Sequence, residues 1–302
     1  MNARALSKIA ALSLLLVSSS GTLPTVRAAA QTIDTAKIER LTGVKGKLND
    51  KEGVFRLAVP RSDLKVTVAG VRMTPPMGLS SWAAFTKDGA QTLVMGDMVL
   101  LEEQVNPVMS VALDNGLEVT ALHNHFLWEH PRVMFMHIGG RGDQEALAAA
   151  VGKVFTKIKE TSGAQAPHTE LDSAKTSLDP KKIEAILGVQ GEMANGVYKL
   201  TWGRTTKMGA HTIGNTMGVN TWAAFVGSDA QAVVDGDFAM YEDELQTVLK
   251  ALRAAGIYIV AIHSHMSRES PKVAFLHYWG IGSTTDLSRA LKSALDTQRR
   301  IP

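Results

Sequence analysis

Hydrophobic positions recur along the chain with two different periods. Segments such as 77–85 and 95–100 alternate or run apolar with aromatic residues between them, which is typical of strands half or fully buried in a sheet. In other segments, such as 245–252, apolar residues recur at helical spacing. Strand-like and helix-like segments follow one another through the chain, so the pattern predicts an α+β fold.

The same succession of segments occurs twice. Met77–Phe85 reads MGLSSWAAF, and Met217–Phe225 reads MGVNTWAAF. The same constant offset in numbering relates two histidine-rich stretches, Val119–His137 and Ile259–His277. In both stretches a short loop separates two apolar strands, which favours antiparallel pairing. We therefore predict two homologous repeats, each a mainly antiparallel sheet with packed helices.

Helix signals mark the ends of each repeat. Residues 34–43 and 179–188 each open with Asp and end with Gly, the preferred residues at the two ends of a helix. Periodic segments at 144–159 and 285–295 predict the closing helices. Before the first histidine-rich stretch, Asn106-Pro107 has the composition of a helix cap followed by a first helical residue.

These signals set the predicted domain boundaries. Repeat 1 covers residues 31–160 and repeat 2 covers residues 178–302. Residues 161–177 are rich in Ser, Gly, Pro and Thr and have little periodicity, which indicates a linker. Each repeat then has an ordinary domain size.

Residues 1–30 have the layout of a secretory signal peptide. Basic residues precede an apolar run from Ile9 to Val17, and small residues end at Ala30. The apolar run is too short to cross a bilayer. We therefore predict a periplasmic or secreted protein, cleaved after Ala30, with no transmembrane segment in the mature chain. The leader carries three basic residues and no acid, so its removal lowers the net charge from +3 to 0, and nothing predicts a nucleic-acid partner.

The chain contains no cysteine. Disulfides, a thiolate nucleophile and a lipid-bearing cysteine after the signal peptide are therefore excluded. Stability has to come from a buried core, which a 45% hydrophobic composition can supply at this length.

The histidine-rich stretches carry the candidate chemistry. Side chains alternate faces along a strand, so two histidines one residue apart point the same way and can share a metal ion. A glutamate follows four residues later and a further histidine lies on the next strand, in both repeats. The candidate ligands are His123, His125, Glu129, His137, His263, His265, Glu269 and His277. Zinc, manganese, iron or copper would suit such a divalent transition-metal site.

More than one ligand set is open in each repeat. A hairpin pairs His123 with Phe135 and Ala121 with His137, which places His137 diagonal to His123. One ion can then be held by His123 and His137, or by His123, His125 and Glu129. We favour Glu129 over His137, and Glu269 over His277 by the same reasoning. The spacing His-x-His-x3-Glu resembles the first metal motif of cupins, a resemblance of local chemistry that does not extend to the fold.

Other matched residues have simpler interpretations. Asp97 and Asp237 follow Gly in both repeats, and a Gly-Asp pair between strands is more typical of a turn than of a residue that orients an imidazole. The aromatic pairs Trp82/Trp222 and Phe85/Phe225 are predicted core residues.

The whole set of motifs resembles a known family. The sequences of Gly78–Phe85, Met95–Glu102, Val105–Met109, Val119–His125 and Pro131–His137 occur in this order. In this respect the chain resembles the LppY/LpqO family, also catalogued as a domain of unknown function. The resemblance implies two tandem copies of that unit and export of the protein, but no established reaction. Named members are lipoproteins, and the absence of cysteine here departs from that pattern.

Two functions fit the sequence. The first is an exported metal-dependent protein in which the duplicated ligands hold an ion that activates water or polarises a small-molecule substrate. The second is a non-catalytic cell-envelope protein that binds a glycan, a peptide or another protein between the repeats, with structural histidines. No Gly-rich phosphate loop, Gly-x-Ser-x-Gly elbow or dinucleotide-binding motif is present, which disfavours nucleotide use and serine hydrolysis.

Overall fold

The structure is a computed structural model that describes residues 32–161, 163 and 165–299. The predicted signal peptide at 1–30 lies outside the described residues. The α-helices are α1 (Thr35–Thr42), α2 (Glu102–Asp114), α3 (Gln144–Glu160), α4 (Pro180–Leu187), α5 (Leu245–Ala254) and α6 (Thr284–Leu295). No helix in the described part of the chain is long and apolar enough to cross a membrane.

Each repeat contributes six strands to one antiparallel sheet. In repeat 1 the strand order is β1-β2-β5-β6-β9-β7, and in repeat 2 it is β16-β18-β15-β14-β11-β10. The strands of repeat 1 are β1 (Gly46–Asn49), β2 (Val54–Pro60), β5 (Ser80–Asp88), β6 (Gln91–Leu101), β7 (Glu118–His123) and β9 (Val133–Gly142). Those of repeat 2 are β10 (Glu192–Ala194), β11 (Val197–Gly203), β14 (Asn220–Gly227), β15 (Ala232–Tyr241), β16 (Tyr258–His263) and β18 (Val273–Gly282). The predicted α+β fold with two mainly antiparallel repeats is therefore confirmed.

Each loop that follows a His-x-His motif contributes one strand to a smaller three-stranded sheet. One consists of β4 (Val71–Arg72), β3 (Thr67–Val68) and β8 (Glu129–His130). The other consists of β13 (His211–Ile213), β12 (Thr206–Met208) and β17 (Glu269–Ser270). Each of the two glutamates predicted as ligands thus begins a short strand.

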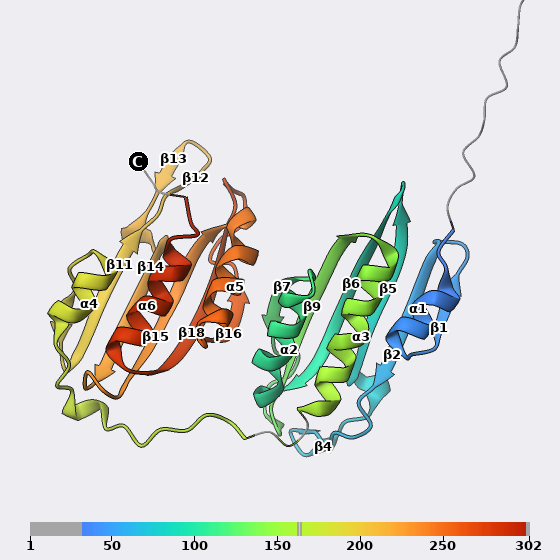
Figure 1. Cartoon of the computed structure of the whole chain (residues 1–302), viewed down its shortest axis with the longest axis horizontal. Helices are drawn as coiled ribbons and strands as arrows, with labels where there is room; N and C mark the ends of the chain where they lie inside the picture. The colour runs from blue at the N-terminus through green and yellow to red at the C-terminus, as the bar shows by residue number, and fades with distance from the viewer. Residues whose placement is uncertain (1–31, 162, 164, 300–302) are drawn as a thin grey trace, which may run out of the picture. The chain divides into compact units, whose positions relative to one another are not determined.

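In each repeat the helices lie on one face of the main sheet. Figure 1 shows α1, α3 and α2 side by side over the strands of repeat 1, and α4, α6 and α5 over those of repeat 2. Strand residues such as Met98, Leu122 and Met136 are buried with helix residues in the main core. The strand residues between these point to the opposite face, where Val99 and Phe135 belong to a smaller hydrophobic cluster. We call this second face the open face.

The helix ends follow the predicted capping. Asp34 accepts a hydrogen bond from the backbone N–H of Lys37, and Gly43 ends α1 in the left-handed conformation. The same arrangement recurs at α4, where Asp179 caps the first turn and Gly188 ends the helix. The predicted closing helices correspond to α3 and α6, with bounds that agree to within one residue.

The predicted start of the helix at Asn106 and Pro107 is wrong. The helix α2 begins at Glu102 and continues through Pro107. Its first turn is stabilised by Gln104, whose side-chain oxygen accepts a 2.9 Å hydrogen bond from the backbone N–H of Leu101. Glu102 and Glu103 add favourable charge at the helix N-terminus. These interactions offset the one helical hydrogen bond that Pro107 cannot donate.

The core assignment of the matched aromatic residues is correct for one pair only. Phe85 and Phe225 are fully buried under the helices. Trp82 and Trp222 are half-buried on the open face, three residues earlier and of opposite parity. A cation covers each ring: Arg56 at 3.9 Å from Trp82 and Lys199 at 4.3 Å from Trp222.

The two repeats contact each other through matched positions. Leu122 of β7 pairs with Ile262 of β16, the residue at the equivalent position of the other repeat. The side chain of Asn106 accepts from the backbone N–H of Ile259 at 2.7 Å and donates to its carbonyl at 3.1 Å.

The reciprocal contact uses Gln246, the counterpart of Asn106. Its side chain accepts from the N–H of Val119 at 3.0 Å and donates to the carbonyl of Val119 at 2.9 Å. The interface therefore has the reciprocity of a two-fold homodimer, joined in one chain.

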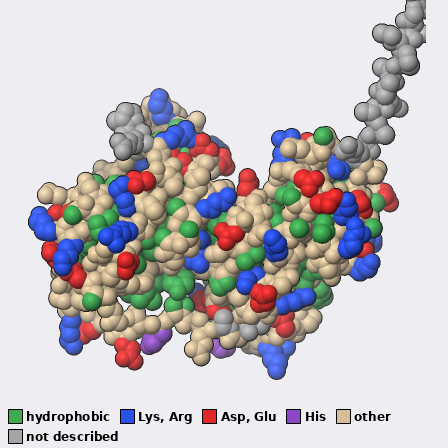
Figure 2. All heavy atoms as spheres, viewed as in Figure 1, with side chains coloured by type: hydrophobic (Ala, Val, Ile, Leu, Met, Phe, Trp, Pro, Cys, Tyr) green, Lys and Arg blue, Asp and Glu red, His purple; other side chains and the backbone are tan. Residues whose placement is uncertain are grey.

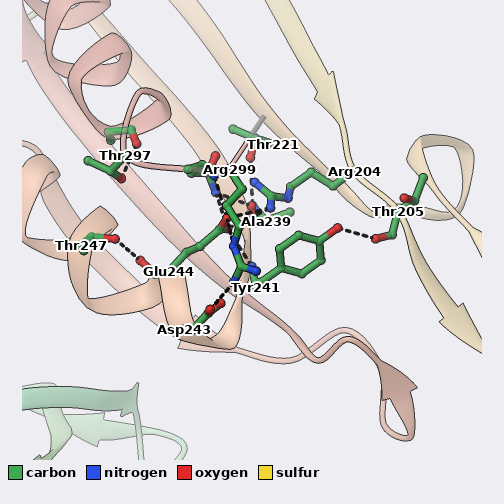
Figure 3. A network of polar contacts seen from close by, with 12 residues as sticks. Arg204, Thr205, Thr221, Ala239, Tyr241, Asp243, Glu244, Thr247, Thr297 and Arg299 are labelled. Carbon is green, nitrogen blue, oxygen red and sulfur yellow. Dashed lines mark hydrogen bonds and ion pairs between the residues drawn. The ribbon is translucent and has the colours of Figure 1, made fainter. Parts of the chain in front are cut away.

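A buried ion pair anchors the C-terminal end of repeat 2 (Figure 3). Arg204 Nη2 lies 2.9 Å from Glu244 Oε2, and both side chains are 5% exposed. Glu244 also accepts hydrogen bonds from the backbone N–H groups of Tyr241 and Arg299, at 3.0 and 2.9 Å. Repeat 1 has the neutral Gln104 at the position of Glu244, so this charge pair belongs to repeat 2 alone.

One face of the molecule carries mixed charge (Figure 2). Figure 2 shows basic and acidic side chains interspersed over the viewed face, without a large field of one sign.

Candidate metal site

Strand alternation brings the predicted histidines to the open face. His123 follows Leu122 of the helix-side core, and His137 lies between the helix-side residues Met136 and Ile138. The side chains of His123 and His137 therefore point away from the helices. In repeat 2 the same argument places His263 and His277 on the open face.

The predicted hairpin register is confirmed. His123 pairs with Phe135 and Ala121 pairs with His137 across β7 and β9. The neighbouring strand β6 adds an aspartate beside these histidines, because Asp97 pairs directly with His137. In repeat 2, Asp237 pairs with His277 in the same way. An aspartate on each repeat thus joins the histidine face.

The interpretation of Gly-Asp as a turn is therefore wrong. Asp97 and Asp237 lie inside the long strands β6 and β15, whose direction does not change at these residues. The glycine is required by close packing across the sheet. A Cβ at Gly96 would lie 2.7 Å from the carbonyl oxygen of Trp82, too close for any side chain.

Three ligand atoms converge in repeat 2. Each of Asp237, His263 and His265 offers one donor atom, and these three atoms lie within 4.8 Å of one another. His265 Nε2 lies 3.3 Å from Asp237 Oδ2 and 3.0 Å from His263 Nε2. A carboxylate and two imidazoles are donors that zinc and other divalent transition metals accept. Three protein ligands leave a coordination position for water or substrate.

Backbone carbonyls fix the tautomers of two histidines in repeat 2. His265 Nδ1 lies 3.3 Å from the carbonyl oxygen of Gly218, and His277 Nδ1 lies 3.3 Å from that of Gly236. A carbonyl accepts only from a protonated nitrogen, so these contacts assign a proton to Nδ1 of each ring, and neutral His265 then has its lone pair on Nε2. Metal-binding histidines are commonly oriented by such a contact.

Ring stacking restricts the histidines further. Phe275 stacks on His265 with ring centroids 3.5 Å apart and planes 11° from parallel. His277 stacks on His263 at 4.7 Å and 13°. His277 lies outside the group of three donor atoms and contacts it through this stacking. The rings of Phe275 and His277 therefore restrict the rotamers of His265 and His263.

Burial sets the electrostatics of the site. The side chain of Asp237 is 4% exposed, and its Oδ1 has no hydrogen-bond partner among the described residues. Burial raises the pKa of Asp237 to about 6, against the opposing effect of His277. Burial lowers the pKa of His263 to about 4, with further contributions from His277 and His265. At neutral pH the site thus holds neutral imidazoles and a poorly compensated carboxylate, which a bound cation would stabilise.

Repeat 1 contains the same residues in a wider arrangement. His125 Nε2 lies 3.9 Å from Asp97 Oδ2, against 3.3 Å for the corresponding atoms of repeat 2. The rings of His123 and His137 stack at 5.2 Å, and His125 lies on Phe135 at 3.3 Å and 6°. Burial lowers the pKa of His125. Among the described residues, the group of three close donor atoms occurs in repeat 2 and not in repeat 1.

The two predicted glutamate ligands have other contacts in the structure. Glu269 Oε1 accepts a 3.3 Å hydrogen bond from the backbone N–H of Val273, and its Oε2 is buried without a partner among the described residues. Glu129 Oε1 lies 3.8 Å from Arg132 Nε. Neither glutamate belongs to the group of three donor atoms.

The aspartates are the site residues that the sequence interpretation set aside. Two signals could have identified them. Asp97 and Asp237 are matched at the same offset in numbering as the histidines, and each is followed directly by a run of apolar residues. A charged residue kept at one position of two buried strands calls for a functional explanation.

Fold and site together define a class: a protein of two α+β repeats that carries a duplicated His/Asp cluster on the open sheet face. A family model described as Domain of Unknown Function (DUF1259) matches residues 36–157 and again residues 181–297. The chain belongs to this family, with two tandem copies of its domain.

The other comparisons add little. No curated protein matches the chain. Among solved structures, the chain is similar to one described as "Crystal structure of a trimeric bacterial microcompartment shell protein PduB", with 12% sequence identity and a TM-score of 0.19. That match covers 83% of this chain and 89% of the other. At this TM-score the similarity carries no argument about fold or function.

Proposed function

We propose that the protein binds a divalent transition metal on the open face of repeat 2. The observation that supports this is the convergence of Asp237, His263 and His265, whose donor atoms lie within 4.8 Å of one another. The carboxylate is buried and one of its oxygens is unpartnered among the described residues, a costly arrangement that a cation would relieve. Zinc, manganese, iron and copper are the candidate metals.

The ligand set has room for further donors. His277 adjoins His263 by stacking, and Glu269 keeps one carboxylate oxygen free of hydrogen bonds to the described residues. Both remain candidates for an additional ligand. Their counterparts His137 and Glu129, together with His123 and His125, define a weaker second site in repeat 1.

A metal at this position would have a chemical role beyond structure. The site lies on a sheet face that the helices do not cover, and three protein ligands leave a position open. A metal held there activates a bound water or polarises a small-molecule substrate. Burial lowers the pKa of both His263 and His265, which favours the neutral imidazoles that coordinate a metal without losing a proton.

We also propose that the protein is exported, as a member of the LppY/LpqO family without a lipid anchor. The support is the layout of residues 1–30 and the order of the family motifs in the sequence. Expression of the whole chain followed by N-terminal sequencing of the mature protein tests this. We expect a mature chain that begins at Gln31, whereas an intact cytoplasmic chain would contradict export.

The test of metal binding is elemental analysis of the protein purified without chelator or affinity metal. We expect about one equivalent of a transition metal in the wild type and in the H123A/H125A variant, and loss of that equivalent in the H263A/H265A variant. Circular dichroism of each variant controls for folding. A wild type that stays metal-free after incubation with zinc, manganese, iron and copper would overturn the proposal. The non-catalytic envelope-binding function would then be the working one.

A further inference from the structure

A second feature of the chain lies away from the proposed metal ligands of repeat 2. A cavity of about 580 Å³ is bordered by the loop after His125, by the first turn of α2, and by β16 and β18 of repeat 2. Its volume is within the range of sites that hold small organic ligands. We call it the inter-repeat cavity.

Aromatic side chains from both repeats line the inter-repeat cavity. Phe126 and Trp128 come from repeat 1, and Tyr258 and Trp279 come from repeat 2. Trp128 is 80% exposed, an unusual state for the largest apolar side chain. Aromatic rings offer apolar contact area together with a negative face that attracts cations.

The charged residues of the cavity are mainly acidic. Glu102, Glu103 and Glu129 line it, against a single Arg132. Arg132 Nε lies 3.9 Å from Glu102 Oε1 and 3.8 Å from Glu129 Oε1, so one guanidinium is shared by two carboxylates. In the described part of the chain, no ion pair involves Glu103. The cavity therefore combines aromatic faces with excess negative charge.

A cavity at the equivalent place of the other repeat provides an internal comparison. It has a volume of about 690 Å³ and includes the counterparts of Glu102, Glu103 and Arg132, namely Glu242, Asp243 and Lys272. No Phe, Tyr or Trp side chain of the described chain lines it.

The aromatic residues of the inter-repeat cavity are not matched in the other repeat. The counterpart of Trp279 is Gly139, that of Tyr258 is Glu118, and that of Trp128 is Arg268. Equivalent surfaces of the two repeats thus differ in aromatic side chains, the groups that suit an organic ligand. The fold alone does not require aromatic residues at these positions.

We propose that the inter-repeat cavity binds an organic cation, an amine or quaternary ammonium group attached to an apolar body. The cationic group meets the faces of Trp128 and Trp279 and the carboxylate of Glu103, and the apolar body is buried against Phe126 and neighbouring aliphatic side chains. The excess negative charge disfavours phosphates and other anions. None of Asp237, His263 and His265 lines this cavity, so the proposal is independent of metal binding in repeat 2.

The test is calorimetric titration of the wild type with benzyltrimethylammonium. The comparison ligand is 2-methyl-1-phenylpropan-2-ol, an uncharged molecule of similar shape. We expect the cation to bind at least five-fold more tightly, because a cation against aromatic faces contributes about 1 kcal/mol. Trp279→Leu and Glu103→Gln should each weaken binding of the cation by about five-fold. Quenching of tryptophan fluorescence gives an independent readout.

Two control variants separate the alternatives. Trp202→Leu, which removes a half-buried tryptophan bordering a different cavity, should leave the affinity unchanged. The H263A/H265A variant should also bind the cation with wild-type affinity, which distinguishes this site from the metal site. Equal affinity for the uncharged molecule would overturn the proposal. So would binding that is insensitive to both Trp279→Leu and Glu103→Gln in variants with wild-type circular dichroism.

Discussion

Replacing Asp237 with Asn should stabilise the metal-free protein at neutral pH. Asp237 is buried, and one of its oxygens lacks a hydrogen bond among the described residues. Its pKa is raised from 3.8 to about 6, so the folded state resists its ionisation. Asn has nearly the same shape and carries no charge. The substitution therefore removes the cost of the buried charge and keeps the volume of the side chain.

The magnitude follows from the pKa change. The rise from 3.8 to about 6 corresponds to about 3 kcal/mol, because each tenfold change in the ionisation constant is worth about 1.4 kcal/mol. Residual solvent screening reduces this, and we expect Asp237→Asn to raise the free energy of unfolding by about 2 kcal/mol at pH 7.

The pH dependence has a definite sign. A raised pKa means that the folded state binds the proton more tightly than the unfolded state does. The contribution of Asp237 to stability is therefore fully present below pH 3.8 and is lost as pH rises through about 6. The advantage of the Asn variant should be absent near pH 4 and reach its full value above pH 6.

The assay is urea unfolding followed by tryptophan fluorescence at several pH values, with a chelator present throughout. Asp50→Asn, at an exposed turn, is the control and should change stability by less than about 0.5 kcal/mol. A variant that is less stable than wild type at pH 7, or a difference that does not change with pH, would refute the reasoning.

Three further predictions concern repeat 2. Glu244→Ala should lower the free energy of unfolding by about 3 kcal/mol in urea titrations, because it leaves Arg204 buried without its partner; a loss below about 1 kcal/mol would contradict this. Metal affinity, measured by competition with a chromophoric chelator, should fall as pH drops below about 6, because Asp237 then binds a proton. The Asn variant should lack this step. Phe275→Leu should weaken metal binding several-fold in the same assay, because it removes the ring stacked on His265; an unchanged affinity would show that the stacking does not hold the ligand.

Much of the fold could be predicted from the sequence because its signals are local. The period of the apolar residues identifies strands and helices, and Asp and Gly mark helix ends such as those of α1. The hairpin register at His123 and Phe135 also follows from a short loop between two strands. Duplication at a constant offset then predicts that repeat 2 folds like repeat 1.

The site could be predicted only in part, because some of its partners are brought together by distant pairing. His263 and His265 are close in sequence, but Asp237 reaches them through the pairing of β15 with β18. The matched aromatic residues Trp222 and Phe225 are both predicted core residues, but alternation puts them on opposite faces of the strand, and the sequence does not tell which face the helices cover. In the structure that tryptophan lies on the open face, in register with Asp237.

The most direct measurement of the central claim is anomalous diffraction from crystals of the protein loaded with cobalt, recorded at the cobalt edge. We expect a peak within coordination distance of Asp237 Oδ2, His263 Nε2 and His265 Nε2. We also expect the peak to disappear in the H263A/H265A variant. The absence of a peak between these three atoms in well-occupied crystals, or a peak bound by other residues without Asp237, would contradict metal binding at this site.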